Sequence, residues 1–390
     1  MKIGVVVQRY GREVIGGSET FARLLSERLA SYFEVDVITT CAVEHVSWKN
    51  VYQPGDEIIN NVKVRRFKNA FLRNKNFSDL HKRLLLSKNS TTILDEIDFQ
   101  KFQGPFSIDL LNYISTKRNE YNIFIFVTYL FFTSFFGLLT VPEKAILIPT
   151  AHDEPTIYLD LFKAIFRIPK GIIFLSPEER EFVHRLFHNE YIPHKVIGVG
   201  VDFVKCDKEK ARKLYNLNFP YLIYVGRIEE AKNIPELIKF FLQYKREFPS
   251  DLKLVLIGEK LIHIPSHKDI IYLGKLSDGD KLDVISSAEI LIQPSQYESF
   301  SLALLEAWSQ KVPVIVNGNC NVLKGHVLRS NGGLYFRNYL EFVEVMNLLI
   351  SDKQLRNKLG ENGFEYVKKN YTWDKIIQQY VDFIQFISKM

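Results

Sequence analysis

Two glutamates, Glu298 and Glu306, lie eight residues apart where a short apolar run gives way to a stretch with helical spacing. We expect a strand over Ile290–Gln293, then a helix over Phe300–Gln310 with Ser299 as its N-cap. At about 1.5 Å per residue, the two α-carbons would be about 12 Å apart if the segment were helical throughout. A glycosidase needs about 5 to 9.5 Å between its two carboxyl groups. The spacing suits one extended ligand that is held at two points, with a phosphate at the helix N-terminus between them.

Two cations follow another apolar run, which predicts a strand over Tyr221–Gly226. Arg227 comes directly after this strand, and Lys232 falls five residues later, just before an expected helix. A guanidinium fork and an ammonium placed in this way can converge on phosphate oxygens and stabilise a leaving group that gains negative charge. The alternative is a surface ion pair with Glu229 or Glu230, and these residues alone do not decide between the two.

Two glycines, Gly16 and Gly17, precede an expected helix over Glu19–Tyr32. Glycine lets the backbone approach a phosphate closely, and a helix N-terminus supplies amide donors to an anion. The pattern is not Gly-x-Gly-x-x-Gly, so the nicotinamide-binding fingerprint is absent. Taken alone, a glycine pair before a helix is more often an ordinary turn, and that alternative stays open.

The segment Ala151–Pro155 follows an expected strand over Ala145–Ile148 and carries His152 between small and acidic residues. A lone histidine in a loop is usually structural or exposed. Asp153 and Glu154 are adjacent, so their side chains point apart and form a poor metal pair. The Asp278–Asp280 segment, Asp-Gly-Asp, is typical of a turn.

The elements that would position these residues alternate between strand and helix along the chain. Such alternation predicts parallel sheets covered by helices. Expected strands of a first run are 3–8, 35–39, 123–128, 145–148 and 171–175, and those of a second run are 221–226, 252–258, 270–273, 290–293 and 312–316. The glycine-rich segment Ile197–Asp202 separates the two runs, and we expect it to be a hinge between the domains. Residues 71–116 interrupt the alternation of strands and helices and predict a helical insertion.

Length and composition agree with two globular domains. A chain of 390 residues, 46% hydrophobic and 25% charged, has room for two cores of about 150 to 200 residues each. Three scattered cysteines, Cys41, Cys206 and Cys320, have no metal-like spacing and are typical of a reducing cytoplasm. The apolar run at the N-terminus breaks at Gln8 and Arg9, so it predicts a first strand rather than a signal peptide.

The segment Ile123–Val141 is almost continuously apolar, lacks charge and reaches the length of a membrane span. The alternative is a buried strand over Ile123–Thr128 followed by a buried helix over Leu130–Leu139. Polar and small residues interrupt the run, and β-branched or aromatic residues dominate its first third. We therefore favour the buried strand and helix.

The net charge of +6 is concentrated in one stretch. Between Lys63 and Lys88 there are nine cations against one acid, Asp79; the cations are Lys63, Arg65, Arg66, Lys68, Arg73, Lys75, Lys82, Arg83 and Lys88. The stretch is either a solvated basic loop or a patch for anionic lipid headgroups or a lipid-diphosphate acceptor. Nucleic acid is not favoured as a partner, because no reader motif accompanies the charge.

Four ordered motifs together resemble one known family. The segment Pro294–Ala307 contains Glu-x7-Glu, and Gly16–Glu19, Ala151–Pro155 and Gly226–Asn233 precede it in the expected order. This set is similar to the signature of retaining GT-B glycosyltransferases, specifically glycosyltransferase family 4, and spans nearly the whole chain. The resemblance implies an α/β chain with two Rossmann-like doubly wound domains facing across a cleft.

The resemblance also implies domain limits. Residues 1–200 would form the acceptor-side domain, with a possible basic helical insertion over 71–116. Residues 201–371 would bind the nucleotide sugar. Residues 372–390 would form a last helix that packs back on the first domain.

For the donor, the resemblance places Arg227 and Lys232, in the family's Arg-x4-Lys spacing, on the diphosphate. Glu306 would bind the ribose hydroxyls of the nucleotide. The amides of the segment that follows Glu298 would face the diphosphate; its residues are Ser299, Phe300, Ser301 and Leu302.

Around the transferred sugar, the resemblance implies that His152 lies beside the ring near the anomeric carbon. Glu298 would bind sugar hydroxyls, and the sequence does not distinguish a sugar clamp from a nucleophile. Gly16 and Gly17 would contact the diphosphate or the incoming acceptor. With this Arg/Lys arrangement, the family pattern implies no divalent metal and no cofactor beyond the donor itself.

The implied function is a cytoplasmic, metal-independent, retaining hexosyltransferase. It would move a sugar from a nucleoside diphosphate sugar, UDP-sugar foremost, to a hydroxyl of a glycan or lipid-linked saccharide in cell-surface polysaccharide biosynthesis. The basic 63–88 stretch suggests peripheral contact with the inner face of the plasma membrane. The alternatives are a catalytically silent partner subunit, a nucleotide-sugar epimerase or hydrolase of the same fold, and a dinucleotide-dependent oxidoreductase, which the missing glycine fingerprint disfavours.

Overall fold

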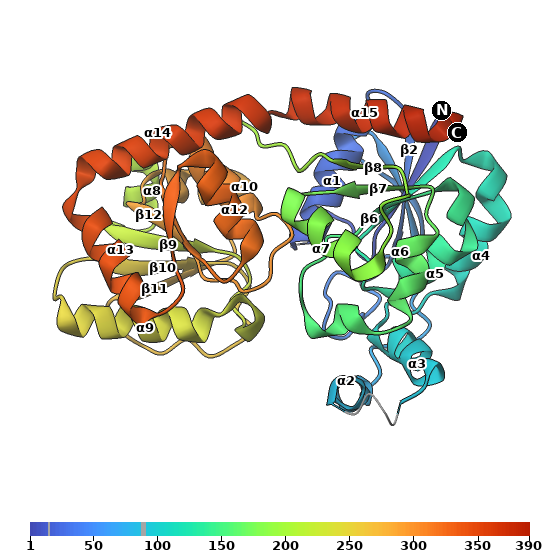
Figure 1. The fold of residues 1–390 in the computed structure, drawn as a ribbon, viewed down its shortest axis with the longest axis horizontal. Helices are drawn as coiled ribbons and strands as arrows, with labels where there is room; N and C mark the ends of the chain where they lie inside the picture. The colour runs from blue at the N-terminus through green and yellow to red at the C-terminus, as the bar shows by residue number, and fades with distance from the viewer. Residues whose placement is uncertain (15, 87–90) are drawn as a thin grey trace. The chain divides into compact units, whose positions relative to one another are not determined.

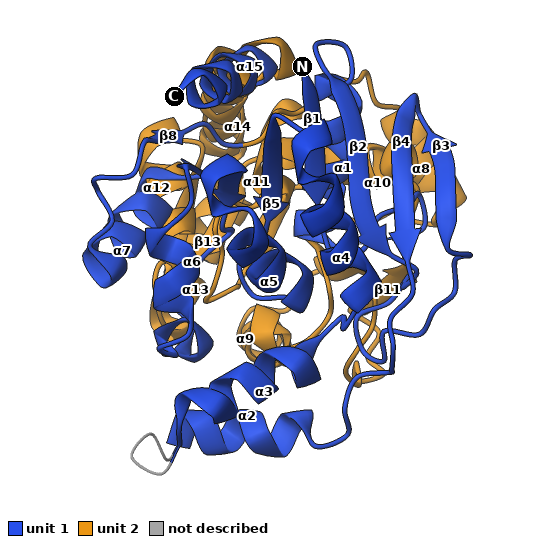
Figure 2. Cartoon of the chain, turned by 90° about the vertical axis from the view of Figure 1, so that its right-hand side faces the viewer, with its two compact units in different colours: residues 1–198, 377–390 blue, residues 199–376 orange. Residues whose placement is uncertain are grey.

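The computed structural model describes residues 1–14, 16–86 and 91–390, so Lys88 of the basic stretch lies outside the described residues. The chain divides into two compact units (Figure 2). Unit 1 comprises residues 1–198 and 377–390, and unit 2 comprises residues 199–376.

Unit 1 is built on an eight-stranded sheet in the order β3-β4-β2-β1-β5-β6-β7-β8. All neighbours pair in parallel except β3 and β4, which form an antiparallel edge hairpin. Its strands are β1 (Lys2–Val6), β2 (Glu34–Thr40), β3 (Gly55–Ile59), β4 (Val62–Phe67), β5 (Ile123–Val127), β6 (Ala145–Ile148), β7 (Gly171–Phe174) and β8 (His194–Val196). Its helices are α1 (Gly17–Leu29), α2 (Phe77–Leu86), α3 (Ile93–Gln103), α4 (Ile108–Lys117), α5 (Phe132–Thr140), α6 (Phe162–Arg167) and α7 (Pro177–Phe187).

Unit 2 is built on a six-stranded, fully parallel sheet in the order β11-β10-β9-β12-β13-β14. Its strands are β9 (Tyr221–Val225), β10 (Lys253–Ile257), β11 (Ile270–Gly274), β12 (Ile290–Gln293), β13 (Val314–Asn317) and β14 (Gly333–Phe336). Its helices are α8 (Lys208–Leu214), α9 (Ile234–Glu247), α10 (Asp278–Ser286), α11 (Leu302–Ser309), α12 (Asn321–Ser330), α13 (Tyr339–Ser351) and α14 (Lys353–Asn370).

The last helix, α15 (Trp373–Lys389), carries the C-terminal end of the chain (Figure 1). Its residues from Ile377 onward belong to unit 1. Within unit 1, the hydroxyl of Tyr380 donates to the carbonyl of Gly198 at 2.9 Å, and Ile387 packs directly over Gly171. The apolar face of α15 is therefore buried on the first unit.

The apolar segment 123–141 is a core strand followed by a core helix, as we favoured. Every residue of β5 is fully buried, and α5 contributes Phe135 and Leu138 to the same core. Among the residues that the structure describes, no helix is long and apolar enough to cross a membrane.

Two arginines of the basic stretch belong to the sheet rather than to a loop. Arg65 and Arg66 lie on β4, a strand that sequence periodicity did not reveal. The Nε of Arg65 is 3.0 Å from a carboxylate oxygen of Asp36, while Arg66 is buried, pairs with Glu57 and stacks on the ring of Tyr52. Reading these two cations as part of a solvated patch is therefore wrong, because their charges are neutralised inside the fold.

Candidate functional site

The carboxyl ends of β9 and β12 bring two of the predicted residues together in unit 2. These strands are parallel neighbours at the point where the strand order reverses, and such switch points are where open α/β sheets bind ligands. The Nζ of Lys232, from the segment after β9, lies 2.7 Å from Oε1 of Glu298, from the segment after β12. Their side chains are only 21% and 14% exposed.

Two glycines shape the backbone beside Lys232. Gly226 and Gly258 end β9 and β10 with φ of 151° and 140°, which only glycine adopts readily. A Cβ on Gly258 would clash with the carbonyl of Gly226, so the two turns pack directly on each other. The hydroxyl of Tyr224 donates to the carbonyl of Arg227 at 2.8 Å and holds that residue in place.

Arg227 makes the ion pair that the sequence left as an alternative. Its Nη2 lies 2.9 Å from Oε1 of Glu229, and about a third of its side chain is exposed. A guanidinium carries five N–H donors, so this ion pair does not by itself exclude a contact between Arg227 and a phosphate. Its place at the end of β9 puts it on the same sheet edge as Lys232.

The helix after Glu298 starts later than predicted. Its N-cap is Ser301 rather than Ser299, and α11 begins at Leu302, so residues 298–301 are not helical and the helical distance of about 12 Å does not apply. Ser301 has φ 83°, an uncommon conformation for a residue with a Cβ. Its buried hydroxyl has no hydrogen-bond partner among the described residues. Such strain and an unsatisfied donor are typical of ligand-binding loops.

Phe300, within this loop, packs its ring against two aromatic side chains. Its buried ring meets His326 edge-on at 5.1 Å and Tyr371 at 5.5 Å. Burial lowers the pKa of His326 to about 3, so this histidine packs as a neutral aromatic group. The side chain of Phe300 is therefore part of the aromatic packing of unit 2.

Glu306 has a partner that the sequence did not reveal. The Nζ of Lys281 lies 2.7 Å from its Oε1, and both side chains are largely buried. Burial alone would lower the pKa of Lys281, but the charges of Glu306 and Asp278 outweigh it and raise the pKa. The segment read as a turn at Asp278 is the first turn of α10, which Ser277 caps.

Gly16, the first residue of the glycine pair in unit 1, lies against the buried ion pair between Arg9 and Glu19. Glu19 accepts hydrogen bonds from Gln8 at 2.8 Å and from Nε of Arg9 at 2.9 Å. A Cβ on Gly16 would clash with the Glu19 carboxylate, whereas a Cβ on Gly17 would meet no atom within 4 Å. A side chain at position 16 would therefore displace the buried Glu19 carboxylate, whereas position 17 has open space.

His152 is the partly exposed member of a tightly held loop. Its Nδ1 lies 3.6 Å from Oε1 of Glu154, and this carboxylate accepts from the Tyr129 hydroxyl at 2.6 Å. Asp153 accepts from the Tyr158 hydroxyl at 2.7 Å. Both acids are therefore engaged by tyrosines. In the described part of the chain, no three His, Cys, Asp or Glu side chains are grouped to hold a metal ion.

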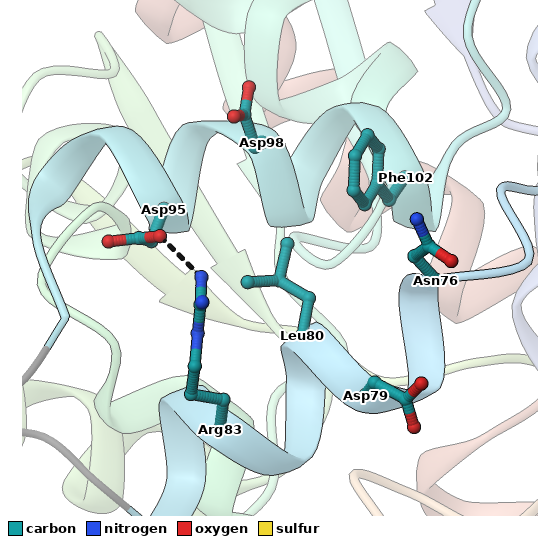
Figure 3. A pocket seen from close by; sticks show the side chains of 7 residues that line it. All are labelled: Asn76, Asp79, Leu80, Arg83, Asp95, Asp98 and Phe102. Carbon is teal, nitrogen blue, oxygen red and sulfur yellow. Dashed lines mark hydrogen bonds and ion pairs between the residues drawn. The ribbon is translucent and has the colours of Figure 1, made fainter.

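A cavity of about 330 Å³ lies between α2 and α3 (Figure 3). Its lining is acidic rather than basic, and Arg83 is neutralised by Asp95 at 2.5 Å. The lining residues are Asn76, Asp79, Leu80, Arg83, Asp95, Asp98 and Phe102. A carboxylate-rich lining does not favour a lipid diphosphate at this place.

Comparison with known proteins agrees with the motifs. Residues 206–366 match the family model described as glycosyl transferases group 1. The capsular polysaccharide biosynthesis glycosyltransferase CapM of Staphylococcus aureus is 25% identical over 208 residues, covering 48% of this chain and 53% of that protein. The UDP-Gal:alpha-D-GlcNAc-diphosphoundecaprenol alpha-1,3-galactosyltransferase of Escherichia coli is 28% identical over 256 residues, covering 58% and 63%. The chain spans about half the length of the curated relatives that it matches.

Solved structures match over the whole chain. Sucrose-phosphate synthase from Thermosynechococcus elongatus has a TM-score of 0.74 at 18% identity, covering 99% of this chain and 98% of that chain. Anabaena Alr3699/HepE in complex with UDP-glucose has a TM-score of 0.71 at 15% identity, covering 100% of both. At such identities the likeness shows the fold, and it confirms the predicted two-domain GT-B α/β architecture.

Proposed function

Because residues 206–366 match the family model described as glycosyl transferases group 1 and the whole chain has the GT-B fold, we propose that this protein is a retaining glycosyltransferase. It takes a sugar from a nucleoside diphosphate donor and attaches it to a hydroxyl of a saccharide. The observation that carries this proposal is the Lys232–Glu298 pair at the switch point of unit 2, beside the strained Ser301.

In this proposal the donor diphosphate lies between Lys232, Arg227 and the amides of residues 299–302. These groups supply the positive charge that the departing diphosphate needs as its bond to the sugar breaks. Glu306 binds the ribose hydroxyls, with Lys281 holding the carboxylate in place. Glu298, already oriented by Lys232, accepts from hydroxyls of the sugar.

The reaction itself needs few further groups. The bond from C1 of the sugar to the diphosphate oxygen breaks, and the acceptor oxygen attacks C1 from the same face. The acceptor proton passes to the leaving diphosphate oxygen, so the anomeric configuration is retained. Because two cations and a helix N-terminus already neutralise the leaving group, we propose that no divalent metal takes part.

We propose UDP-sugar as the donor and a glycan or lipid-linked saccharide as the acceptor. Support for the donor comes from solved structures of the same fold in complex with UDP or UDP-glucose. Support for the acceptor comes from the names of the Staphylococcus aureus and Escherichia coli relatives. Any contact with anionic lipid would use the exposed lysines of the basic stretch, Lys68, Lys75 and Lys82, rather than the buried Arg66.

The first test is nucleotide binding. We would measure thermal shifts and calorimetric titrations with UDP, GDP, ADP, TDP and NAD, each with Mg²⁺ and with EDTA. Wild type, Lys232→Ala and the exposed control Lys239→Ala would be compared. We expect binding of one nucleoside diphosphate in the presence of EDTA, weakened only in Lys232→Ala.

The second test is product analysis with the donor that binds. Transfer to an added saccharide supports the proposal. Release of free sugar without acceptor would indicate a hydrolase, and a new donor isomer an epimerase. Absence of binding to every nucleotide would instead indicate a catalytically silent subunit.

A further inference from the structure

Glu179 on α7 is a buried carboxyl whose two oxygens bind two strand ends at once. Oε1 accepts from the amide of Ala151 and Oε2 from the amide of Leu175, both at 2.6 Å. The side chain belongs to a residue that is only 1% exposed. Because β6 and β7 are parallel neighbours, their carboxyl ends lie side by side, and Glu179 ties them together.

This arrangement is unusual for a carboxyl in a protein core. Burying such a group is unfavourable unless it is hydrogen-bonded and, when ionised, paired with a cation. Within the described residues, no lysine, arginine or histidine is recorded as an ion-pair partner of Glu179, and its support comes from backbone amides. A side chain kept at this position for packing alone would be apolar.

The amide that Glu179 holds belongs to the residue directly before His152. The same loop is held twice more, because Tyr129 donates to Glu154 at 2.6 Å and His81 contacts the Thr156 hydroxyl at 2.9 Å. His152 lies between the first two of these attachment points and is 27% exposed. A side chain that must meet a sugar in one orientation gains from supporting contacts of this kind.

We propose that Glu179 is a positioning residue that sets the orientation of His152 through the amide of Ala151. The inference rests on the proposed function and on the contact with the transferred sugar that the family resemblance implies for His152. Glu179 itself does not touch the donor. Both hydrogen bonds need a side chain with two acceptor oxygens. Glutamine has only one, so its NH₂ group would face one of the two backbone amide donors.

The test compares Glu179→Gln with Glu181→Gln, the same chemical change at an exposed position of α7. Hydrogen–deuterium exchange reports on the loop without any need for activity. We expect residues 149–155 to exchange at least about tenfold faster in Glu179→Gln, while β5 is unchanged in both variants. Unchanged exchange at 149–155 would overturn the inference.

Kinetics then separate positioning from general stability. We expect kcat for sugar transfer to fall about tenfold in Glu179→Gln, as for a misplaced substrate contact, with UDP binding unchanged. In a His152→Ala background, Glu179→Gln should not lower kcat for sugar transfer any further. An equal loss in both backgrounds would contradict positioning through His152.

Two outcomes need separate treatment. If wild type transfers no sugar and binds no nucleotide, the proposed function fails, while the exchange experiment still decides whether Glu179 holds the loop. If Glu179→Gln does not fold, Glu179→Asp replaces it, because a carboxyl shorter by one methylene cannot reach both amides. Slow exchange at 149–155 in Glu179→Asp would then count against the inference.

Discussion

The ammonium of Lys232 lies 2.7 Å from a carboxylate oxygen of Glu298, although 66 residues separate them in the chain. Both side chains are mostly shielded from water, so their attraction is weakly screened. The pair therefore holds a cation and an acceptor at the switch point before any ligand arrives. Such preorganisation lowers the reorganisation that a charged substrate would otherwise require.

We predict that Lys232→Ala lowers kcat for sugar transfer by about 10² to 10³, because a cation facing the leaving diphosphate is lost. Glu298 would then stay uncompensated near the phosphate and add repulsion. Lys232→Ala combined with Glu298→Gln should therefore bind UDP more tightly than Lys232→Ala alone. Isothermal titration of the two variants measures this, and equal affinities would exclude the repulsion.

Glu306 should discriminate between nucleotides with and without ribose hydroxyls. Loss of a charged hydrogen-bond acceptor costs about 1.5 to 3 kcal/mol, so Glu306→Gln should weaken UDP binding about 10- to 100-fold. Binding of 2′,3′-dideoxy-UDP should be nearly the same in wild type and variant. A similar loss for both ligands would show that Glu306 acts elsewhere. Lys281→Met should mimic the effect in part, since it releases the carboxylate.

Gly17→Ala is a probe for a ligand next to α1. The added Cβ meets no protein atom within 4 Å, so we expect an unchanged or slightly raised Tm. Sugar transfer should nevertheless fall at least about tenfold if a substrate passes this backbone. Gly279→Ala, also in open space at a helix start, serves as the control and should keep full activity. Full activity of Gly17→Ala would remove this residue from the site.

The stability of unit 1 should depend on pH through Glu179. Burial raises the pKa of Glu179 to about 8, and the amides of Leu175 and Ala151 oppose that rise. Between pH 4.5, the ordinary pKa, and about 8, the folded protein keeps a proton that the unfolded chain releases. The free energy of unfolding should therefore fall as pH rises through this window.

Urea unfolding at pH 5, 6.5 and 8.5 would measure this effect. Relative to Glu179→Gln, which has no such proton, wild type should lose stability as pH rises. Glu181→Gln should follow wild type. Parallel curves for wild type and Glu179→Gln would show that the carboxyl titrates near its ordinary pKa.

The basic stretch should separate into structural and surface charges. Arg66→Ala should lower Tm by several degrees, because Arg66 is buried and donates to the Tyr10 carbonyl at 2.7 Å. Replacing the exposed Lys68, Lys75 and Lys82 by Ala should leave Tm unchanged and weaken any binding to anionic vesicles. Vesicle binding that survives this triple change would rule out lipid contact through these lysines.

The sequence by itself determined the α/β class, the two runs of strands and the order of the motifs. The strands at Ala145–Ile148 and Ile290–Gln293 were predicted to the residue, because near-continuous apolar runs bounded by proline or polar residues are local signals. Strand β4, the second strand from the edge of the sheet, escaped prediction because its alternation is carried partly by arginines, whose burial depends on distant acids such as Asp36. The start of α11 was predicted two residues too early, because Ser299 and Ser301 are equally suitable N-cap residues by sequence.

Only the tertiary structure decided which loops meet. The adjacency of β9 and β12 joins Lys232 to Glu298, and nothing near either residue encodes strand order. The same holds for Lys281 beside Glu306 and for Glu179 beneath Ala151. Periodicity reports on residues a few positions apart, whereas the partner of a buried charge is set by chain segments that the whole fold brings together.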